Sequence, residues 1–301
     1  TRANDSGAII FEYDLLTNIL SRKYTLAADG SGNYSAGLSA FNGVLYGIAS
    51  RVGQSYKNII FSFNPATNSF NTIKDLESNY GVPERSSFCF YNNKFYGHLR
   101  KTDNSSIAIY ELDPSTNSFT YKSEIGSGRV PIGRLTYLNG KMYGLIRSGL
   151  TSPSNGGIYE WDPLTNSGQI RFTLNIFNDG RTINSGQLIP YNNKLYGSTM
   201  DGGSQFWGTL FEWDPVTNIL STKAEFPHTD YGFVSLVIKN NIIYGTHSNG
   251  GVFNEGRCFS FDPNIAAYKT LYQFSSDSAG VFPINNLISI NNNLYGVSYM
   301  G

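Results

Sequence analysis

The chain has 301 residues, of which 15% are aromatic and only 15% are charged. Lysine plus arginine equals aspartate plus glutamate, so the formal net charge is zero, which argues against electrostatic binding to nucleic acid. No apolar run approaches the length of a transmembrane helix, so membrane insertion is not expected. The chain opens with TRANDSG, without an initiator Met or a signal-peptide core, and is therefore expected to be a mature or excised piece.

Two sequence markers recur along the chain. The first is the dipeptide Tyr-Gly, which occurs at intervals of about 50 residues, at Tyr46, Tyr96, Tyr143, Tyr196, Tyr244 and Tyr295. The second is an aromatic residue or leucine followed by Asp or Asn and usually by Pro, at Asp14, Asn64, Asp113, Asp162, Asp214 and Asp262. The two markers interleave, so the sequence predicts six copies of one structural repeat.

Each repeat is expected to contain four short strands, A to D. Strand A is a run such as LIPY (188–191), and an Asn-Asn or Asn-Gly turn with positive φ leads into strand B, KLYGS (194–198). A longer Gly-rich loop precedes strand C, TLFEW (209–213), and the turn DPVTN (214–218) leads into strand D, ILSTKAEF (219–226). In that turn Asp caps backbone amides, Pro presets φ and Asn tolerates the left-handed region, so the acidic residues are expected to be structural.

The two chain ends carry complementary halves of a repeat. Residues 8–26 form a strand C–D pair, and residues 287–301 form a strand A–B pair. Joined in one sheet, they predict an all-β, six-bladed β-propeller with four antiparallel strands per blade, the last blade closed by the N- and C-terminal strands. A single domain is expected over 1–301, with blades at 36–80, 86–128, 133–178, 186–228, 234–276 and 285–301 plus 7–26.

The repeated Tyr-Gly dipeptide is expected to lie in the core between blades. Tyr supplies buried area there, and Gly allows a neighbouring backbone to approach. Cys89 and Cys258 lie in apolar strand-like runs far apart in the repeat order, so both are expected to be free thiols.

The repeats also resemble a known family. LYG…GG…GTLFEWDPVTN in the fourth repeat, and the matching stretches of the third and fifth, resemble the GLoVer-type tandem repeat of secreted bacterial proteins, which is loosely related to Kelch-like propellers. The resemblance implies a propeller in an extracellular or cell-surface setting and offers no catalytic residues to transfer. The first two repeats lack the Gly-Gly of the B–C loop, and the Asp262 turn lacks Thr-Asn.

The long and varied D–A and B–C loops are expected on one face, at the mouth of the central channel, and function is expected there. Arg51, Arg100 and Arg147 end strand B in three successive blades and form a candidate arc for carboxylate or sulfate groups. Pairing of the loop arginines with acidic residues of the same face is the alternative interpretation.

Aromatic residues of the loops form a second candidate set, either for stacking on sugars or as small satellite cores. These residues are Tyr34, Tyr80, Phe206, Trp207, Tyr231, Phe253 and Phe282. Residues just before strand A are expected to line the channel mouth, among them Arg134, Gln187 and Asn286. His98 and His247, near the ends of strand B, complete the candidate ligand-binding residues.

No known catalytic or metal-binding motif spacing occurs, so no catalytic residue, metal site or cofactor is predicted. The favoured hypothesis is a binding or adhesion module, extracellular or on the cell surface, monomeric and directed at a glycan or surface polysaccharide. The alternative is a polysaccharide lyase or other glycan-active enzyme, in which Arg neutralises a uronate carboxylate and His247 or Tyr231 removes a proton. A spacer whose loops bind nothing is the third possibility.

Overall fold

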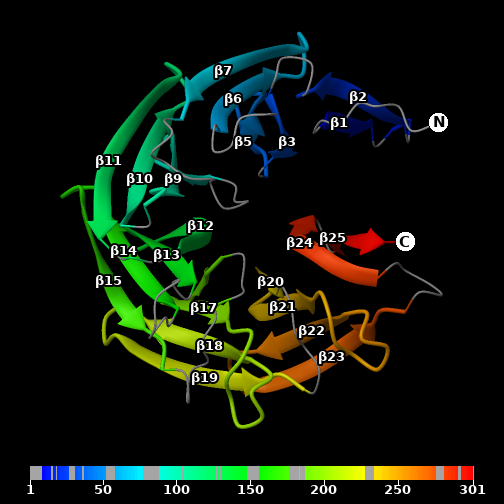
Figure 1. The fold of residues 1–301 in the computed structure, drawn as a ribbon. Coiled ribbons are helices and arrows are strands. Elements are labelled where there is room, and N and C mark those ends of the chain that lie inside the picture. Colours follow the sequence, from blue (N-terminus) through cyan, green and yellow to red (C-terminus); the bar gives the residue numbers. More distant parts are fainter. Residues whose placement is uncertain are drawn as a thin grey trace. The chain divides into compact units, whose positions relative to one another are not determined.

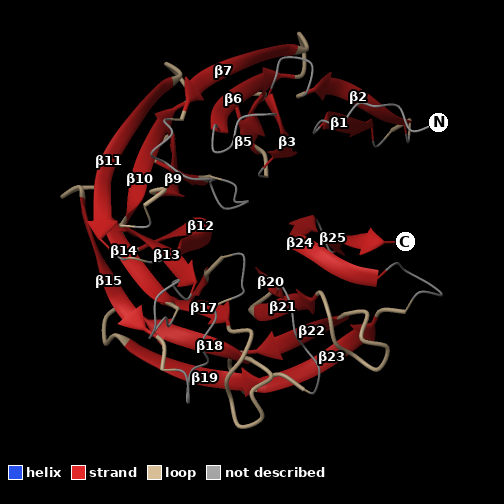
Figure 2. Ribbon diagram, in the orientation of Figure 1, coloured by secondary structure: helices blue, strands red, loops and turns tan. Residues whose placement is uncertain are grey.

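The computed structural model describes residues 9–14, 16–17, 19–26, 31–35, 37–51, 58–76, 88–103, 105–126, 128, 130–147, 156–175, 183, 187–227, 234–275, 281–290 and 293–300. These residues form strands, turns and loops, without a helix among them (Figure 2). The chain comprises two compact units, Thr1–Gly128 and Arg129–Gly301. The expected single domain over 1–301 stays a prediction.

The first compact unit contains a strand pair and two blades (Figure 1). The pair is β1 (Ile9–Asp14) with β2 (Ile19–Thr25). Blade 1 contains β3 (Ser31–Ser35), β4 (Ser39–Phe41), β5 (Val44–Arg51), β6 (Asn58–Asn64) and β7 (Ser69–Asp75). Blade 2 contains β8 (Cys89–Tyr91), β9 (Lys94–Arg100), β10 (Ser106–Asp113) and β11 (Ser118–Gly126).

The second compact unit contains three blades and a strand pair. Blade 3 contains β12 (Val130–Leu138), β13 (Lys141–Arg147), β14 (Gly157–Asp162) and β15 (Ser167–Thr173). Blade 4 contains β16 (Ile189–Tyr191), β17 (Lys194–Ser198), β18 (Thr209–Asp214) and β19 (Ile219–Glu225). Blade 5 contains β20 (Val234–Lys239), β21 (Ile242–His247), β22 (Arg257–Asp262) and β23 (Ala267–Gln273). The pair is β24 (Val281–Ile290) with β25 (Asn293–Met300).

The predicted fold class, an all-β chain of antiparallel propeller blades, is confirmed. Strands follow one another in sequence order across each blade, and in blade 1 both β3 and β4 pair with β5 as a divided strand A. The predicted sixth blade is represented by its two halves, β1–β2 and β24–β25, each a two-stranded sheet. Hydrogen bonding of β25 to β1, which would close that blade, stays a prediction.

The turns have the predicted chemistry. The first residue of each described A–B turn is an asparagine in the left-handed region, at φ 48 to 49°. At the C–D turns the carboxylate of Asp113, Asp162, Asp214 or Asp262 accepts a hydrogen bond from the backbone amide two residues later, at 2.8–2.9 Å. In the Asp262 turn, Ala266 takes the left-handed position that asparagine holds in the other blades, at φ 52°.

The hydrophobic core lies between consecutive blades within each compact unit. One cluster joins Tyr46 and Ile60 of blade 1 to Phe95 of blade 2, and another joins Leu145 of blade 3 to Trp213 of blade 4. The strand pair β1–β2 packs against blade 1 through the same kind of cluster. Stacking of apolar sheet faces therefore holds neighbouring blades together.

Four of the Tyr-Gly tyrosines are buried as predicted, Tyr244 is half-buried, and Tyr295 at the end of the chain is 49% exposed. The predicted reason for the glycine is wrong in one respect. A Cβ at Gly197 would overlap the ring of Phe211, its cross-strand partner, and Gly97 lies against Tyr110 in the same way. The glycine makes room for an aromatic ring of its own blade.

A polar cluster accompanies this packing in blades 2 and 4. In blade 4 the hydroxyl of Tyr196 donates a short hydrogen bond to Glu212, which also lies 2.7 Å from Lys194 and 3.1 Å from Lys223. In blade 2 Tyr96 donates to Glu111 at 2.8 Å. The hydrogen bonds and ion pairs of such a cluster offset the cost of burying a carboxylate that is almost removed from water.

Neither cysteine forms a disulfide, as predicted. The Cys89 side chain is buried, and burial raises the pKa of the Cys258 thiol to about 11. Cys258 therefore lacks the lowered pKa of a reactive cysteine.

Candidate functional site

The B–C loops of blades 4 and 5 have the same backbone structure. In the β17–β18 loop, the amides of Phe206 and Gly208 donate to the carbonyls of Gly203 and Gly202 at 3.3 and 3.1 Å. In the β21–β22 loop, the amides of Asn254 and Gly256 donate to the carbonyls of Gly251 and Gly250 at 3.2 and 3.0 Å. The shared spacing Gly-Gly-x-x-x-x-Gly (202–208 and 250–256) therefore encodes one ordered loop.

Equivalent positions of the two loops differ in one important way. Phe206 and Asn254 both have left-handed backbones, at φ 60° and 56°. Asparagine tolerates that conformation, whereas a bulky residue is strained there, by roughly 1–2 kcal/mol. The ring of Phe206 is 58% exposed, so burial does not offset the strain. Strain at an exposed side chain points to a role outside the fold.

The loop of blade 4 is fastened to strand D. The Ser204 hydroxyl donates to the Glu225 carboxylate at 2.5 Å, and the amide of Phe226 donates to the Gly208 carbonyl at 2.9 Å. The loop is thereby held in one conformation, which keeps the Phe206 ring in solvent.

The loop of blade 5 also presents apolar side chains. Val252 is 77% exposed and Phe253 is 60% exposed. Gln273 accepts a hydrogen bond from the Val252 amide at 2.7 Å, and the Glu255 carbonyl accepts one from the Phe282 amide of β24 at 2.8 Å. Phe282, itself in the left-handed region at φ 57°, thus lies beside this loop. The exposed side chains of this loop therefore lie on a backbone that is held by hydrogen bonds.

Two of the residues predicted to line the channel mouth, Arg134 and Gln187, make contacts between blades. Arg134 lies in an irregular part of β12 and forms a bridge to Gln187 of blade 4. Gln187 is 6% exposed, and its side-chain amide donates to the Leu236 carbonyl of blade 5 at 3.4 Å. Asn286 lies in the irregular part of β24, and its side chain is outside the described part of the structure.

The predicted arginine arc combines residues of both compact units and stays a prediction. Arg100 ends β9 and is half-buried, and Arg147 ends β13 and is exposed. The backbone of Arg51 ends β5, but its side chain is not among those described.

Both histidines of the candidate set are buried in blades. His98 is 2% exposed, and His247 is fully buried with its ring 4.2 Å from that of Phe226 and 5.0 Å from that of Phe259. Burial is the main cause that lowers the pKa of His247 to about 3, and the positive charge of the nearby Arg257 is the second. The imidazole is therefore neutral at physiological pH and acts as part of the aromatic core.

The remaining candidates are aromatic. Trp207 follows Phe206 in the loop of blade 4 and is half-buried. Tyr34 lies in β3, but only its backbone is described, and Tyr231 falls outside the described residues. Phe206 and Phe253 belong to the broad set of loop aromatics predicted from the sequence. The repeated Gly-Gly-x-x-x-x-Gly spacing is the sequence signal that distinguishes them within that set.

Among the described residues, no three His, Cys, Asp or Glu side chains gather as metal ligands. The same residues include no long apolar helix able to cross a membrane.

Three solved structures share this fold at low sequence identity. The extracellular domain of a B. thetaiotaomicron protein described as a one component system matches with a TM-score of 0.61 and 12% identity, over 99% of this chain and 35% of that one. Oligogalacturonate lyase in complex with manganese matches with a TM-score of 0.56 and 12% identity, over 88% and 73%. A chain of the nidogen/laminin complex matches with a TM-score of 0.51 and 11% identity, over 89% and 90%. This chain thus spans about a third of the one component protein.

No curated protein matches the sequence. The sequence profile of the Gloeobacter/Verrucomicrobia repeat matches residues 99–301, which is two thirds of the chain and includes the Gly-rich loops of blades 4 and 5. The chain belongs to the Gloeobacter/Verrucomicrobia repeat family.

Proposed function

We propose that this protein is an extracellular or cell-surface binding module whose ligand is a glycan, held on the exposed aromatic residues of the B–C loops of blades 4 and 5. The observation that carries the proposal is Phe206, a strained and 58% exposed aromatic residue on an ordered loop. Its backbone conformation costs stability, and its ring contributes little to the core. Ligand binding would explain why a phenylalanine occupies this position.

The chemistry of these loops suits a sugar surface. Phe206 and Phe253 present apolar ring faces to water, and such rings pack against the C–H faces of pyranose units. Asn254 of the same loops is exposed; its Oδ1 accepts a hydrogen bond from the Gly250 amide at 3.2 Å, and its side-chain NH2 group can donate to a sugar hydroxyl. Fixed loops reduce the entropy lost on binding. The similarity to an extracellular domain supports an extracellular or cell-surface setting.

A glycan array that includes neutral, uronate-rich and sulfated polysaccharides tests the proposal. We expect binding that falls at least about tenfold in Phe206→Asn and in Phe253→Ser, because each removes one stacking ring. Val216→Ser is the matched control, since Val216 is 84% exposed but lies at the C–D turn, at the other end of blade 4. Equal binding by all three variants, or no binding by the parent protein, would refute the proposal.

The similarity to oligogalacturonate lyase favours a second candidate, cleavage of a uronate polymer by β-elimination. An arginine would neutralise the uronate carboxylate, and a neutral base would remove the adjacent proton. His247 does not suit this role, because its imidazole is fully buried against Phe226. Tyr231, the other predicted base, lies outside the described residues.

Incubation with polygalacturonate, followed by the absorbance of unsaturated products, separates the two candidates. The binding proposal predicts no product, with or without added divalent cations. Product that disappears in Tyr231→Phe would establish the lyase instead.

A further inference from the structure

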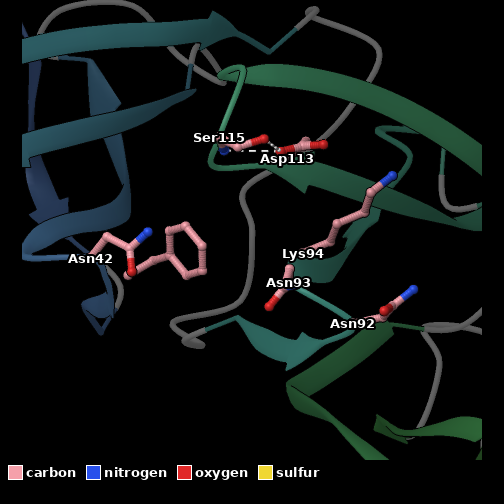
Figure 3. Close-up of a pocket in the computed structure, with 7 residues that line it drawn as sticks. Asn42, Asn92, Asn93, Lys94, Asp113 and Ser115 are labelled. Atoms are coloured by element: carbon pink, nitrogen blue, oxygen red, sulfur yellow. Dashed lines mark hydrogen bonds between the residues drawn. The ribbon is translucent and has the colours of Figure 1, made fainter.

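A cavity of about 420 Å³ opens where blades 1 and 2 adjoin, at the end of the strands that carries the A–B and C–D turns (Figure 3). Three tight turns of the first compact unit contribute its walls. Its lining residues are Phe41, Asn42, Asn92, Asn93, Lys94, Asp113 and Ser115. In Figure 3, Asn42 of blade 1 lies across the cavity from Asn93 of blade 2, with Asp113 and Ser115 on the adjoining C–D turn.

The junction of blades 3 and 4 has the same turn sequences but a different arrangement. There Asn139 donates its side-chain amide to the Asn193 carbonyl oxygen at 3.2 Å and ties the two A–B turns together. The equivalent residues, Asn42 and Asn93, line the cavity instead. The amides at blades 1 and 2 are therefore presented to the cavity, whereas those at blades 3 and 4 satisfy each other.

Aromatic packing distinguishes this junction from that of blades 3 and 4. Phe41 packs against Phe90 at a ring distance of 5.6 Å and against Phe95 at 6.4 Å. The equivalent positions at the other junction are Leu138, Pro190 and Leu195, which are smaller. Phe90 remains 48% exposed, so an apolar ring surface lies next to the cavity's aromatic wall.

The charges of the cavity are already compensated. The ammonium of Lys94 lies 2.7 Å from the carboxylate of Glu111. The Asp113 carboxylate accepts hydrogen bonds from the Ser115 hydroxyl at 2.6 Å and from the Ser115 amide at 2.9 Å, which lower its pKa. A charged ligand therefore gains little here, whereas the asparagine amides offer both donors and acceptors.

We propose that this cavity is a second ligand site, which binds one or two units of a neutral sugar. Planar amides and one carboxylate suit vicinal hydroxyl groups, and Phe41 supplies an apolar surface for the sugar ring. The volume is within the range of small-molecule sites. The site lies on turns whose sequence indicated only structure, and it is separate from the aromatic loops of blades 4 and 5.

Titration of ¹⁵N-labelled protein with cellobiose, maltose and N,N′-diacetylchitobiose tests this site, with digalacturonate as the charged comparison. The side-chain amide signals of Asn42 and Asn93 are assigned by their loss in Asn42→Gly and Asn93→Gly. Glycine keeps these left-handed backbones unstrained, as Gly43 and Gly140 do at the second turn position. We expect at least one neutral disaccharide to shift both signals, and Asn93→Gly to weaken its binding about tenfold.

Asn193→Gly is the matched control, since it removes the same group from the same turn position of blade 4, where Asn139 already occupies it. We expect this variant to bind the disaccharide as the parent does. Absence of shifts at tens of millimolar sugar, or an equal loss in Asn193→Gly and Asn93→Gly, would overturn the proposal. Phe206→Asn separates the two sites, because it weakens loop binding and leaves the cavity shifts unchanged.

Discussion

The left-handed residues of this chain show how single positions divide between folding and binding. Asparagine occupies most of them, and its side chain tolerates φ near 50–60°. Phe206 and Ala266, at φ 60° and 52°, are two of the three exceptions among the described residues, and Phe282 is the third, at φ 57°. The first presents an exposed ring and the second lies in a C–D turn, so only the first has a proposed ligand.

Replacing Phe206 and Ala266 by asparagine separates strain from binding. We expect Phe206→Asn and Ala266→Asn each to raise the free energy of unfolding by about 1 kcal/mol, since each relieves a left-handed L-residue. Urea unfolding measures this gain. Glycan binding is expected to fall in Phe206→Asn alone. A loss of stability in Phe206→Asn would show that the ring packs in solution and would contradict its proposed role.

Glu212 carries a pH dependence that can be tested. Burial is the largest single influence and favours a raised pKa, but hydrogen bonds from Lys194, Tyr196 and Lys223 outweigh it and lower the pKa below 4.5. Because the folded-state pKa is the lower one, the stabilisation is present above about pH 4.5 and is lost as the pH falls further.

The variant Glu212→Gln tests this linkage. It removes a carboxylate that is 10% exposed and leaves two lysines without their partner, so we expect a loss of about 1–2 kcal/mol at neutral pH. The difference from the parent protein should shrink as the pH falls through the lowered folded-state pKa, below which Glu212 is protonated in both states. A difference that is constant with pH in chemical denaturation would contradict the assignment.

At the scale of the strand, the Tyr-Gly dipeptide links sequence to packing. Tyrosine contributes buried area, and the following glycine accommodates the aromatic ring of the cross-strand residue, as Gly197 does for Phe211. Any side chain at this position would force that ring out of the blade core.

Gly197→Ala is expected to lower the free energy of unfolding by about 1–3 kcal/mol, because its Cβ meets the Phe211 ring. Gly126→Ala is the matched control, since Gly126 also lies in a strand but has no atom within 4 Å of an added Cβ. We expect that change to stay within about 0.5 kcal/mol. Equal effects of the two substitutions in urea unfolding would refute the close-packing explanation.

Elements were predictable to the extent that their chemistry is local. The C–D turns follow from Asp and Asn at fixed spacing, and the A–B turns follow from Asn pairs with positive φ. The burial of His247 was not predictable, because it depends on the rings of Phe226 and Phe259 from two adjoining blades. The cavity at Asn42 and Asn93 was equally unpredictable from the sequence. The same turn sequences are joined by a side-chain hydrogen bond at Asn139 and Asn193 but line a cavity at Asn42 and Asn93.

At the scale of the whole molecule, the account depends on closure of a ring through the two chain ends. In blades 2 to 4 the Tyr-Gly tyrosine is the cross-strand partner of a glutamate, as Tyr196 is of Glu212. The terminal strands carry the same two residue types, Tyr295 in β25 and Glu12 in β1. The repeat therefore predicts that Tyr295 pairs with Glu12.

The strand after Glu12 supports this register. Lys23 lies 2.8 Å from Glu12 in β1–β2, and Lys223 lies 3.1 Å from Glu212 in blade 4, at the same sequence spacing. The strand pair β1–β2 thus has the glutamate and the lysine of this cluster. In blades 2 and 4 a tyrosine hydroxyl also belongs to the cluster. Tyr295 is 49% exposed in β24–β25, and we expect it to supply the hydroxyl of this cluster if the ring closes.

Disulfide trapping between the terminal strands measures closure directly. In a chain with Cys89→Ala and Cys258→Ala, we expect Glu12→Cys with Tyr295→Cys to form an intramolecular disulfide, because cross-strand partners lie within bonding range. Phe11→Cys with Tyr295→Cys should form little, since neighbouring residues of a strand point to opposite faces. Mass spectrometry of the unreduced protein gives the answer. The absence of the first crosslink, or equal yields from the two pairs, would contradict a ring closed by its own chain ends.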